Sequence, residues 1–117
     1  MKIDKGLDIL LKSAVDLGYT KAYICGAISS IGYDKAKEEF GCFSDKVQKY
    51  GLIPFSTFSQ PQPKNREKDV YVKDGIKIMM DCDVIVAMDS AFLSKNALKQ
   101  IEVAKIVGIP VIKNGIL

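Results

Sequence analysis

The chain has 117 residues, of which 48% are hydrophobic and 26% charged, and it contains no histidine. These proportions fit a single globular domain over residues 1–117. Without histidine, Ser-His-Asp and Cys-His catalysis and histidine-containing zinc sites are excluded. The net charge of +3 comes from lysines spread along the chain, and Arg66 is the sole arginine. Because a nucleic-acid groove more often carries an arginine-rich stripe, we expect no nucleic-acid partner.

The three cysteines, Cys25, Cys42 and Cys82, form no CxxC pair, and two of them lie in apolar runs. Buried free thiols in a reducing compartment explain this pattern better than disulfides do. The N-terminal segment carries charges within its apolar stretch, and no segment approaches transmembrane length. The sequence therefore predicts a soluble, cytoplasmic protein with no membrane partner, no metal site and no cofactor.

The spacing of apolar residues predicts helices and strands in alternation along the chain. Leucines at helical spacing indicate a first helix within residues 1–20, which Gly18 ends. The segment 58–68 contains two prolines and no periodicity, so it is the longest predicted loop and a candidate lid. The remaining elements are strands at 21–27, 52–57, 83–89 and 110–114 and helices at 36–50, 69–80 (with Met79 and Met80 facing inward) and 95–107.

This alternation implies right-handed βαβ crossovers and a parallel sheet with helices on both faces. We expect a small doubly wound α/β fold, flavodoxin- or Rossmann-like, with about four or five strands in the order 2-1-3-4. In such sheets ligands bind beyond the C-terminal ends of the strands. That edge would collect the loops at 26–32, 57–68 and 89–96, so the functional site is expected there.

The loop that starts at Gly26 matches neither the dinucleotide fingerprint GxGxxG nor the phosphate-binding P-loop. Gly26 nevertheless lets backbone N–H groups approach a ligand, and Ser29 and Ser30 precede a helix N-terminus, which attracts anions. A plain strand-to-helix turn explains these residues equally well.

Gln100 is the most informative polar residue of the last predicted helix. On a helical wheel it falls within the apolar arc, whereas Glu102 lies on the opposite side. A buried amide costs free energy unless it is hydrogen-bonded. This favours a Gln100 that faces a pocket over a core glutamine satisfied by local backbone. The apolar arc is formed by Ala97, Ile101, Val103, Ala104 and Val107.

Three further polar side chains are candidates. Asp89 follows the clearest central strand, where its carboxylate can accept hydrogen bonds from ligand hydroxyls. Asp74 lies off the apolar stripe of its helix, and its position alone indicates a solvated carboxylate. Tyr23, in the first strand, is equally consistent with core packing and a satisfied hydroxyl. Asp81 and Asp83 lie at the opposite edge and are expected to be turn residues.

Three segments carry a resemblance to a known family. They are YICGAIS at 23–29, KDGIKIMMDCDVIVAM at 73–88 and SKNALKQIEVAKIVGIPVI at 94–112. Their order and placement resemble the nucleoside 2-deoxyribosyltransferase-like superfamily, most closely its small domain-of-unknown-function 4406 type branch in bacteria and phages. The resemblance covers residues 21–113 and leaves the first helix unexplained.

Transferases of that superfamily use a glutamate near the start of the last helix as the nucleophile. The resemblance places Gln100 at that position and Tyr23 at the tyrosine that orients the nucleophile. It places Asp74 and Ser94 where carboxylates on a helix and in a loop contact the base. Ala27 and Asn96 stand where members usually have proline and glycine. A neutral amide cannot act as the nucleophile in place of a carboxylate, so the resemblance implies that ordinary glycosyl transfer is impaired.

The first function implied is binding of a nucleoside-, nucleotide- or ADP-ribose-type molecule without glycosyl transfer, in a sequestering or sensing protein. A phage anti-defence protein that sequesters a nucleotide immune signal is a concrete version. In this interpretation Ser94 and Asn96 line the pocket and Gln100 and Asp89 hold ribose hydroxyls. Asp74 contacts the base, Phe55 or Phe58 stacks on it, and a phosphate lies on the loop formed by Gly26, Ala27, Ile28, Ser29 and Ser30.

The alternative is an active N-glycoside hydrolase or deoxyribosyltransferase in which Asp74 or Asp89 acts with Tyr23 and an activated water. A protein-interaction domain on the same fold is a third possibility. Exposed sheet edges also predict a homo-oligomer, a dimer or larger, and the first helix is a candidate for that contact.

Overall fold

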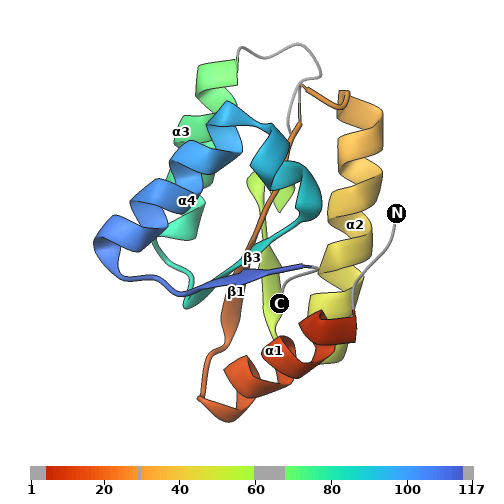
Figure 1. The fold of residues 1–117 in the computed structure, drawn as a ribbon, viewed down its shortest axis with the longest axis vertical. Coiled ribbons are helices and arrows are strands. Elements are labelled where there is room, and N and C mark those ends of the chain that lie inside the picture. The colour runs from red at the N-terminus through yellow and green to blue at the C-terminus, as the bar shows by residue number, and fades with distance from the viewer. Residues whose placement is uncertain (1–4, 29, 60–67, 115–117) are drawn as a thin grey trace.

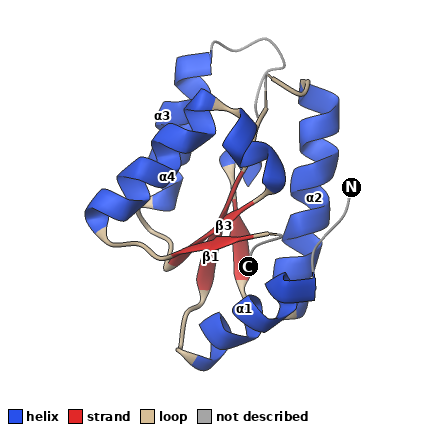
Figure 2. Cartoon of the chain, viewed as in Figure 1, coloured by secondary structure: helices blue, strands red, loops and turns tan. Residues whose placement is uncertain are grey.

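The computed structural model describes residues 5–28, 30–59 and 68–114, with the side chains of the last range described from Val72 onward. Its centre is a sheet of four parallel strands in the order β2-β1-β3-β4 (Figures 1 and 2). The strands are β1 (Lys21–Cys25), β2 (Ile53–Phe55), β3 (Val84–Ala87) and β4 (Val111–Lys113). The helices are α1 (Lys5–Asp16), α2 (Tyr33–Lys49), α3 (Lys68–Met79) and α4 (Lys95–Val107), with 3-10 turns η1 (Thr57–Ser59) and η2 (Asp89–Leu93).

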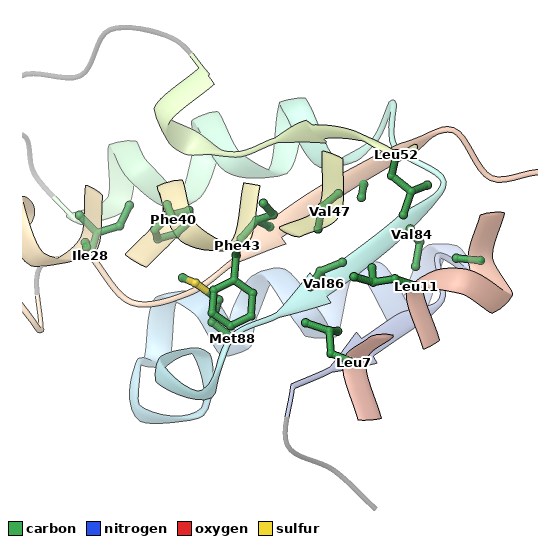
Figure 3. Packing of buried hydrophobic residues seen from close by; sticks show 14 residues of the cluster. Leu7, Leu11, Ile28, Phe40, Phe43, Val47, Leu52, Val84, Val86 and Met88 are labelled. Carbon is green, nitrogen blue, oxygen red and sulfur yellow. The ribbon is translucent and has the colours of Figure 1, made fainter. Parts of the chain in front are cut away.

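Each face of the sheet has its own hydrophobic core, because successive residues of a strand point to opposite faces. On one face, α1 and α2 pack Leu11 and Phe43 against Val86 of β3 (Figure 3). On the other face, α3 and α4 pack Met79 and Ile101 against alternate residues of β1 and β3. The predicted α/β class, the strand order and the helices on both faces are therefore confirmed.

The parallel register brings the C-terminal ends of the strands to a common edge. Tyr23 of β1 lies level with Phe55 of β2 and with Ile85 of β3. The turn after β1, η1 and η2 all leave the sheet at this edge. Of the predicted loop at 58–68, Phe58 and Ser59 lie in η1, and residues 60–67 lie outside the described residues.

Two side chains predicted to face inward do not. Val107 is 46% exposed and Met80 is 49% exposed. Val107 is the last residue of α4 before Gly108, whose φ of 83° ends the helix. Met80 follows the last residue of α3. At both helix ends the apolar stripe extends beyond the surface that the sheet offers.

The outer edge of β2 carries a proline. Ile53 donates its N–H to the carbonyl of Thr20 over 2.7 Å, so its backbone faces β1. Backbone groups alternate in direction along a strand, so Pro54 turns toward the open edge, where it has no N–H to donate. None of the helices in the described ranges is both long and apolar enough to cross a membrane.

The first helix is part of the core. Leu7 and Leu11 of α1 are fully buried. Asp8 also forms an ion pair with Lys46 of α2, with 2.6 Å between Oδ1 and Nζ. The helix that the resemblance leaves unexplained thus completes one face of the sheet.

Truncation of Leu11 tests this packing. Leu11→Ala should lower the free energy of unfolding by about 2–5 kcal/mol, because it leaves a cavity between α1 and the sheet. Urea denaturation followed by circular dichroism measures the change. Ile9→Ala is the matched control, since Ile9 is 70% exposed, and it should change stability by no more than about 0.5 kcal/mol. Equal effects of the two substitutions would contradict the packing.

Asp83 joins the starts of β1 and β3. Its Oδ2 accepts the backbone N–H of Thr20 (2.8 Å), the Thr20 hydroxyl (3.1 Å) and the N–H of Lys21 (3.1 Å). These hydrogen bonds, above all those from the two backbone N–H groups, hold the pKa of Asp83 below its ordinary value of 3.8.

A folded-state pKa below the unfolded one means that Asp83 stabilises the fold fully above its unfolded pKa. This contribution is lost as the pH falls from about 4 through the lower folded pKa. Asp83→Ala should therefore reduce stability at neutral pH and flatten the decline in stability between about pH 5 and 3. Thermal unfolding at neutral pH and between about pH 5 and 3 measures both effects. Asp81→Ala removes an exposed carboxylate close by and should retain most of the stability. An unchanged acid profile in Asp83→Ala would refute this role.

Candidate functional site

A small cavity lies at the C-terminal edge of the sheet, between the turn after β1, η1, α3 and α4. Its volume is about 20 Å³, which is room for about one water molecule. None of the described residues that line it is charged. They are Gly26, Ile28, Thr57, Val72, Ser94, Asn96, Ala97 and Gln100.

Gln100 forms one wall of this cavity and is 6% exposed. Its Oε1 accepts the hydroxyl of Tyr23 at 3.1 Å and the thiol of Cys25 at 3.4 Å. Its Nε2 donates to the carbonyl of Val72 at 3.4 Å. The side chain of Gln100 thus faces a cavity, and its hydrogen-bond partners lie on β1 and α3 instead of in the local backbone that the alternative of a core glutamine assumed.

Tyr23 of β1 holds Gln100 in place through the hydrogen bond from its hydroxyl. The Tyr23 side chain is 1% exposed, and its hydroxyl also lies 3.3 Å from Oγ1 of Thr57. Burial raises the pKa of Tyr23 well above its ordinary value of 10.0, so the phenol remains protonated and donates to Gln100. Burial likewise raises the pKa of Cys25 to about 12, which keeps its thiol neutral. The group around Gln100 is therefore uncharged at neutral pH.

The start of α4 and the turn after β1 are held by serine hydroxyls. Oγ of Ser94 accepts the N–H of Ala97 at 3.2 Å, which caps α4. Oγ of Ser90 accepts the N–H of Ala27 at 3.1 Å, which ties the turn after β1 to η2. Because these hydroxyls already accept backbone N–H groups, they fix the shape of the site.

Neither candidate carboxylate, Asp74 or Asp89, is among the described residues that line the cavity. Asp89 is exposed at the start of η2, and its Oδ1 accepts the side-chain N–H of Asn114 at 3.2 Å. Asp74 is half-buried on α3, one residue before Gly75. In the described ranges no three His, Cys, Asp or Glu side chains are grouped so that they could hold a metal ion.

The candidate aromatic residues lie elsewhere as well. Phe58 packs edge-on against Phe40, with 5.0 Å between ring centroids, and against Tyr33 at 5.4 Å, so it faces α2. Phe55 lines hollows beside β2 instead of the Gln100 cavity. Ser29 lies outside the described residues.

The structure thus brings Tyr23, Gly26, Ile28, Ser94, Asn96 and Gln100 together. Four further residues of the site were not predicted from the sequence, namely Thr57, Ala97, Val72 and Cys25. Thr57 carried a signal, because it is a polar residue at the C-terminal end of a predicted strand. Val72 contributes a backbone carbonyl to Gln100, and no side-chain pattern marks such a group.

Removal of the Tyr23 hydroxyl tests the support of Gln100. Tyr23→Phe should lower the free energy of unfolding by about 1 kcal/mol, because the Oε1 of Gln100 retains only the weak thiol donor of Cys25. Tyr19→Phe is the control, since Tyr19 packs against the core while partly exposed, and the change should stay within about 0.5 kcal/mol. Equal stability of the Tyr23 variant and the parent chain would contradict the assignment.

The family model described as Domain of unknown function (DUF4406) matches residues 20–113. The match begins just before β1, ends with β4 and includes every described residue that lines the cavity. No curated protein matches the sequence. Because the match covers most of the chain, this protein belongs to the DUF4406 family.

Proposed function

We propose that this protein binds a nucleoside-, nucleotide- or ADP-ribose-type molecule at the Gln100 cavity and does not transfer its glycosyl group. The observation that carries the proposal is the uncharged carboxamide of Gln100 in the wall of that cavity. The resemblance to the nucleoside 2-deoxyribosyltransferase-like superfamily places the attacking glutamate at this position. An amide there retains hydrogen bonding and lacks the nucleophile.

The electrostatics of the cavity favour binding over catalysis. Glycoside chemistry uses a pair of carboxylates across the scissile bond. The described lining residues include no carboxylate, and the nearby Tyr23 and Cys25 remain protonated because burial raises the pKa of each. The second candidate function, an N-glycoside hydrolase or deoxyribosyltransferase that uses Asp74 or Asp89, has less support. Asp89 is exposed and hydrogen-bonded to Asn114, and Asp74 is not among the described residues that line the cavity.

The size of the cavity limits how a ligand binds. A pocket that encloses a nucleoside has a volume of about 300 Å³ or more, whereas this cavity has about 20 Å³. In our proposal one hydroxyl-sized group of the ligand occupies the cavity, and the rest of the ligand lies above the strand ends. A ribose hydroxyl suits this position, because it both donates and accepts hydrogen bonds, as do the side chains of Ser94, Asn96 and Gln100.

Such a protein would act by holding its ligand, as a sequestering or sensing protein does. A homo-oligomer, predicted from the exposed sheet edges, is part of the same proposal. The strands β2 and β4 form those edges.

Calorimetric titration tests the binding. Adenosine, 2′-deoxyadenosine, AMP and ADP-ribose are titrated into the protein, and we expect saturable binding of at least one of them. Gln100→Ala should weaken that binding by about tenfold or more, because it removes a buried hydrogen-bonding group from the site. Gln48→Ala is the matched control, since Gln48 is an exposed glutamine of α2, and it should bind as the parent does. Absence of binding to all of these probes would refute the proposal.

Incubation of the same compounds with the protein, followed by chromatography, tests for turnover. We expect no release of adenine. Release that disappears in Asp74→Ala or Asp89→Ala would establish the glycosidase instead.

A further inference from the structure

Gly75 is a buried glycine in the interior of α3. Glycine inside a helix destabilises it relative to alanine, because the unfolded chain has more conformational freedom. The glycines with positive φ among the described residues are Gly18, Gly32, Gly51 and Gly108, so the backbone at residue 75 does not require glycine. The reason for a glycine here must lie in what surrounds it.

The surroundings of Gly75 are the polar pair of Tyr23 and Gln100. A Cβ at residue 75 would lie 2.2 Å from Nε2 of Gln100, 2.3 Å from the hydroxyl of Tyr23 and 3.1 Å from Cδ of Gln100. Ordinary contacts of a Cβ begin at 3.4 Å. The backbone of α3 therefore approaches these two side chains more closely than any residue with a side chain allows.

Neither neighbour can move away without cost. The Tyr23 side chain is 1% exposed and packs within the core cluster between the sheet and the helices α3 and α4. Gln100 can make room only by giving up the hydrogen bond from Nε2 to Val72, and with it the orientation in which it lines the cavity. At Gly26, by contrast, the nearest obstacle to a Cβ is the flexible end of Met88.

We propose that Gly75 is a positioning residue for Gln100. Because residue 75 has no side chain, the backbone of α3 can pack directly over Tyr23 and Gln100. In this position the carbonyl of Val72 on α3 holds the carboxamide in the wall of the cavity. The consequence for ligand affinity rests on the proposed function. The consequence for the orientation of Gln100 does not.

Gly75→Ala tests the inference, with Gly41→Ala as the matched control. Gly41 is also a helical glycine, and a Cβ there would meet nothing within 4 Å. Gly41→Ala should raise the midpoint of thermal unfolding by about 3–6 °C through helix propensity alone. Gly75→Ala should lower the midpoint in spite of the same gain in propensity.

The side-chain amide of Gln100 reports its orientation directly. In ¹H–¹⁵N spectra its NH₂ signals are identified by their loss in Gln100→Ala. The chemical shifts of these signals should change in Gly75→Ala and remain the same in Gly41→Ala. A Gly75→Ala protein with unmoved Gln100 signals would overturn the proposal.

A variant cycle separates positioning from a general defect of α3. In the Tyr23→Phe, Gln100→Ala background the obstacles to a Cβ are removed, so Gly75→Ala should now raise the midpoint as Gly41→Ala does. An equal decrease of the unfolding midpoint by Gly75→Ala in the parent and in the double variant would overturn the proposal. If Gly75→Ala alone does not fold, a folded triple variant supports the inference and an unfolded one refutes it.

Binding separates this inference from the proposed function. Where the parent binds one of the adenosine-type probes, Gly75→Ala should weaken binding about tenfold, as Gln100→Ala does. Unchanged affinity would overturn the role of Gly75 at the site. If the parent binds none of the probes, the proposed function fails, and the Gln100 signals and the variant cycle still decide whether Gly75 positions Gln100.

Discussion

The hydrogen bond from the hydroxyl of Tyr23 to Oε1 of Gln100 is the interaction on which one half of the molecule depends. It joins β1 to α4 inside an apolar core, and the bond from Nε2 to the carbonyl of Val72 joins α3 to the same amide. An unsatisfied buried amide costs about 1–3 kcal/mol, so both helices are restricted to positions that satisfy it. The position of the amide in the wall of the cavity follows from this constraint.

The fold was predictable because the apolar patterns that specify its helices and strands lie within short segments of the sequence. Apolar runs of strand length alternate with residues at helical spacing, and the crossover rule then leaves few topologies. The inward position of Gln100 was predictable for the same reason, since Ala97, Ile101 and Ala104 mark its side of the helix and all are buried. The errors at Met80 and Val107 have a different origin. Periodicity shows which side of a helix is apolar, but not where the sheet beneath that side ends.

Much of the site was beyond sequence analysis, because it depends on groups that meet only in the folded chain. The thiol of Cys25 and the carbonyl of Val72 contact Gln100 from separate elements. The approach of α3 to Tyr23 at Gly75 also depends on how a helix packs against the sheet. Asp89 was correctly placed after β3, yet η2 and the bond from Asn114 hold its carboxylate at the surface. The positions of these residues at the ends of predicted strands indicated the correct edge of the sheet. Which side chains line the cavity at that edge depends on how the elements pack.

Pro54 has a consequence for how the molecule meets other chains. An open strand edge is a template on which a further strand, from the same or another protein, can add and start aggregation. Pro54 offers an incoming strand its carbonyl as an acceptor but has no N–H to donate to a carbonyl of that strand. The backbone hydrogen bonds would therefore be interrupted in the middle of β2, which spans only Ile53–Phe55. This side of the sheet is thereby protected against fibre-like growth, and any contact between copies that extends the sheet is directed to β4.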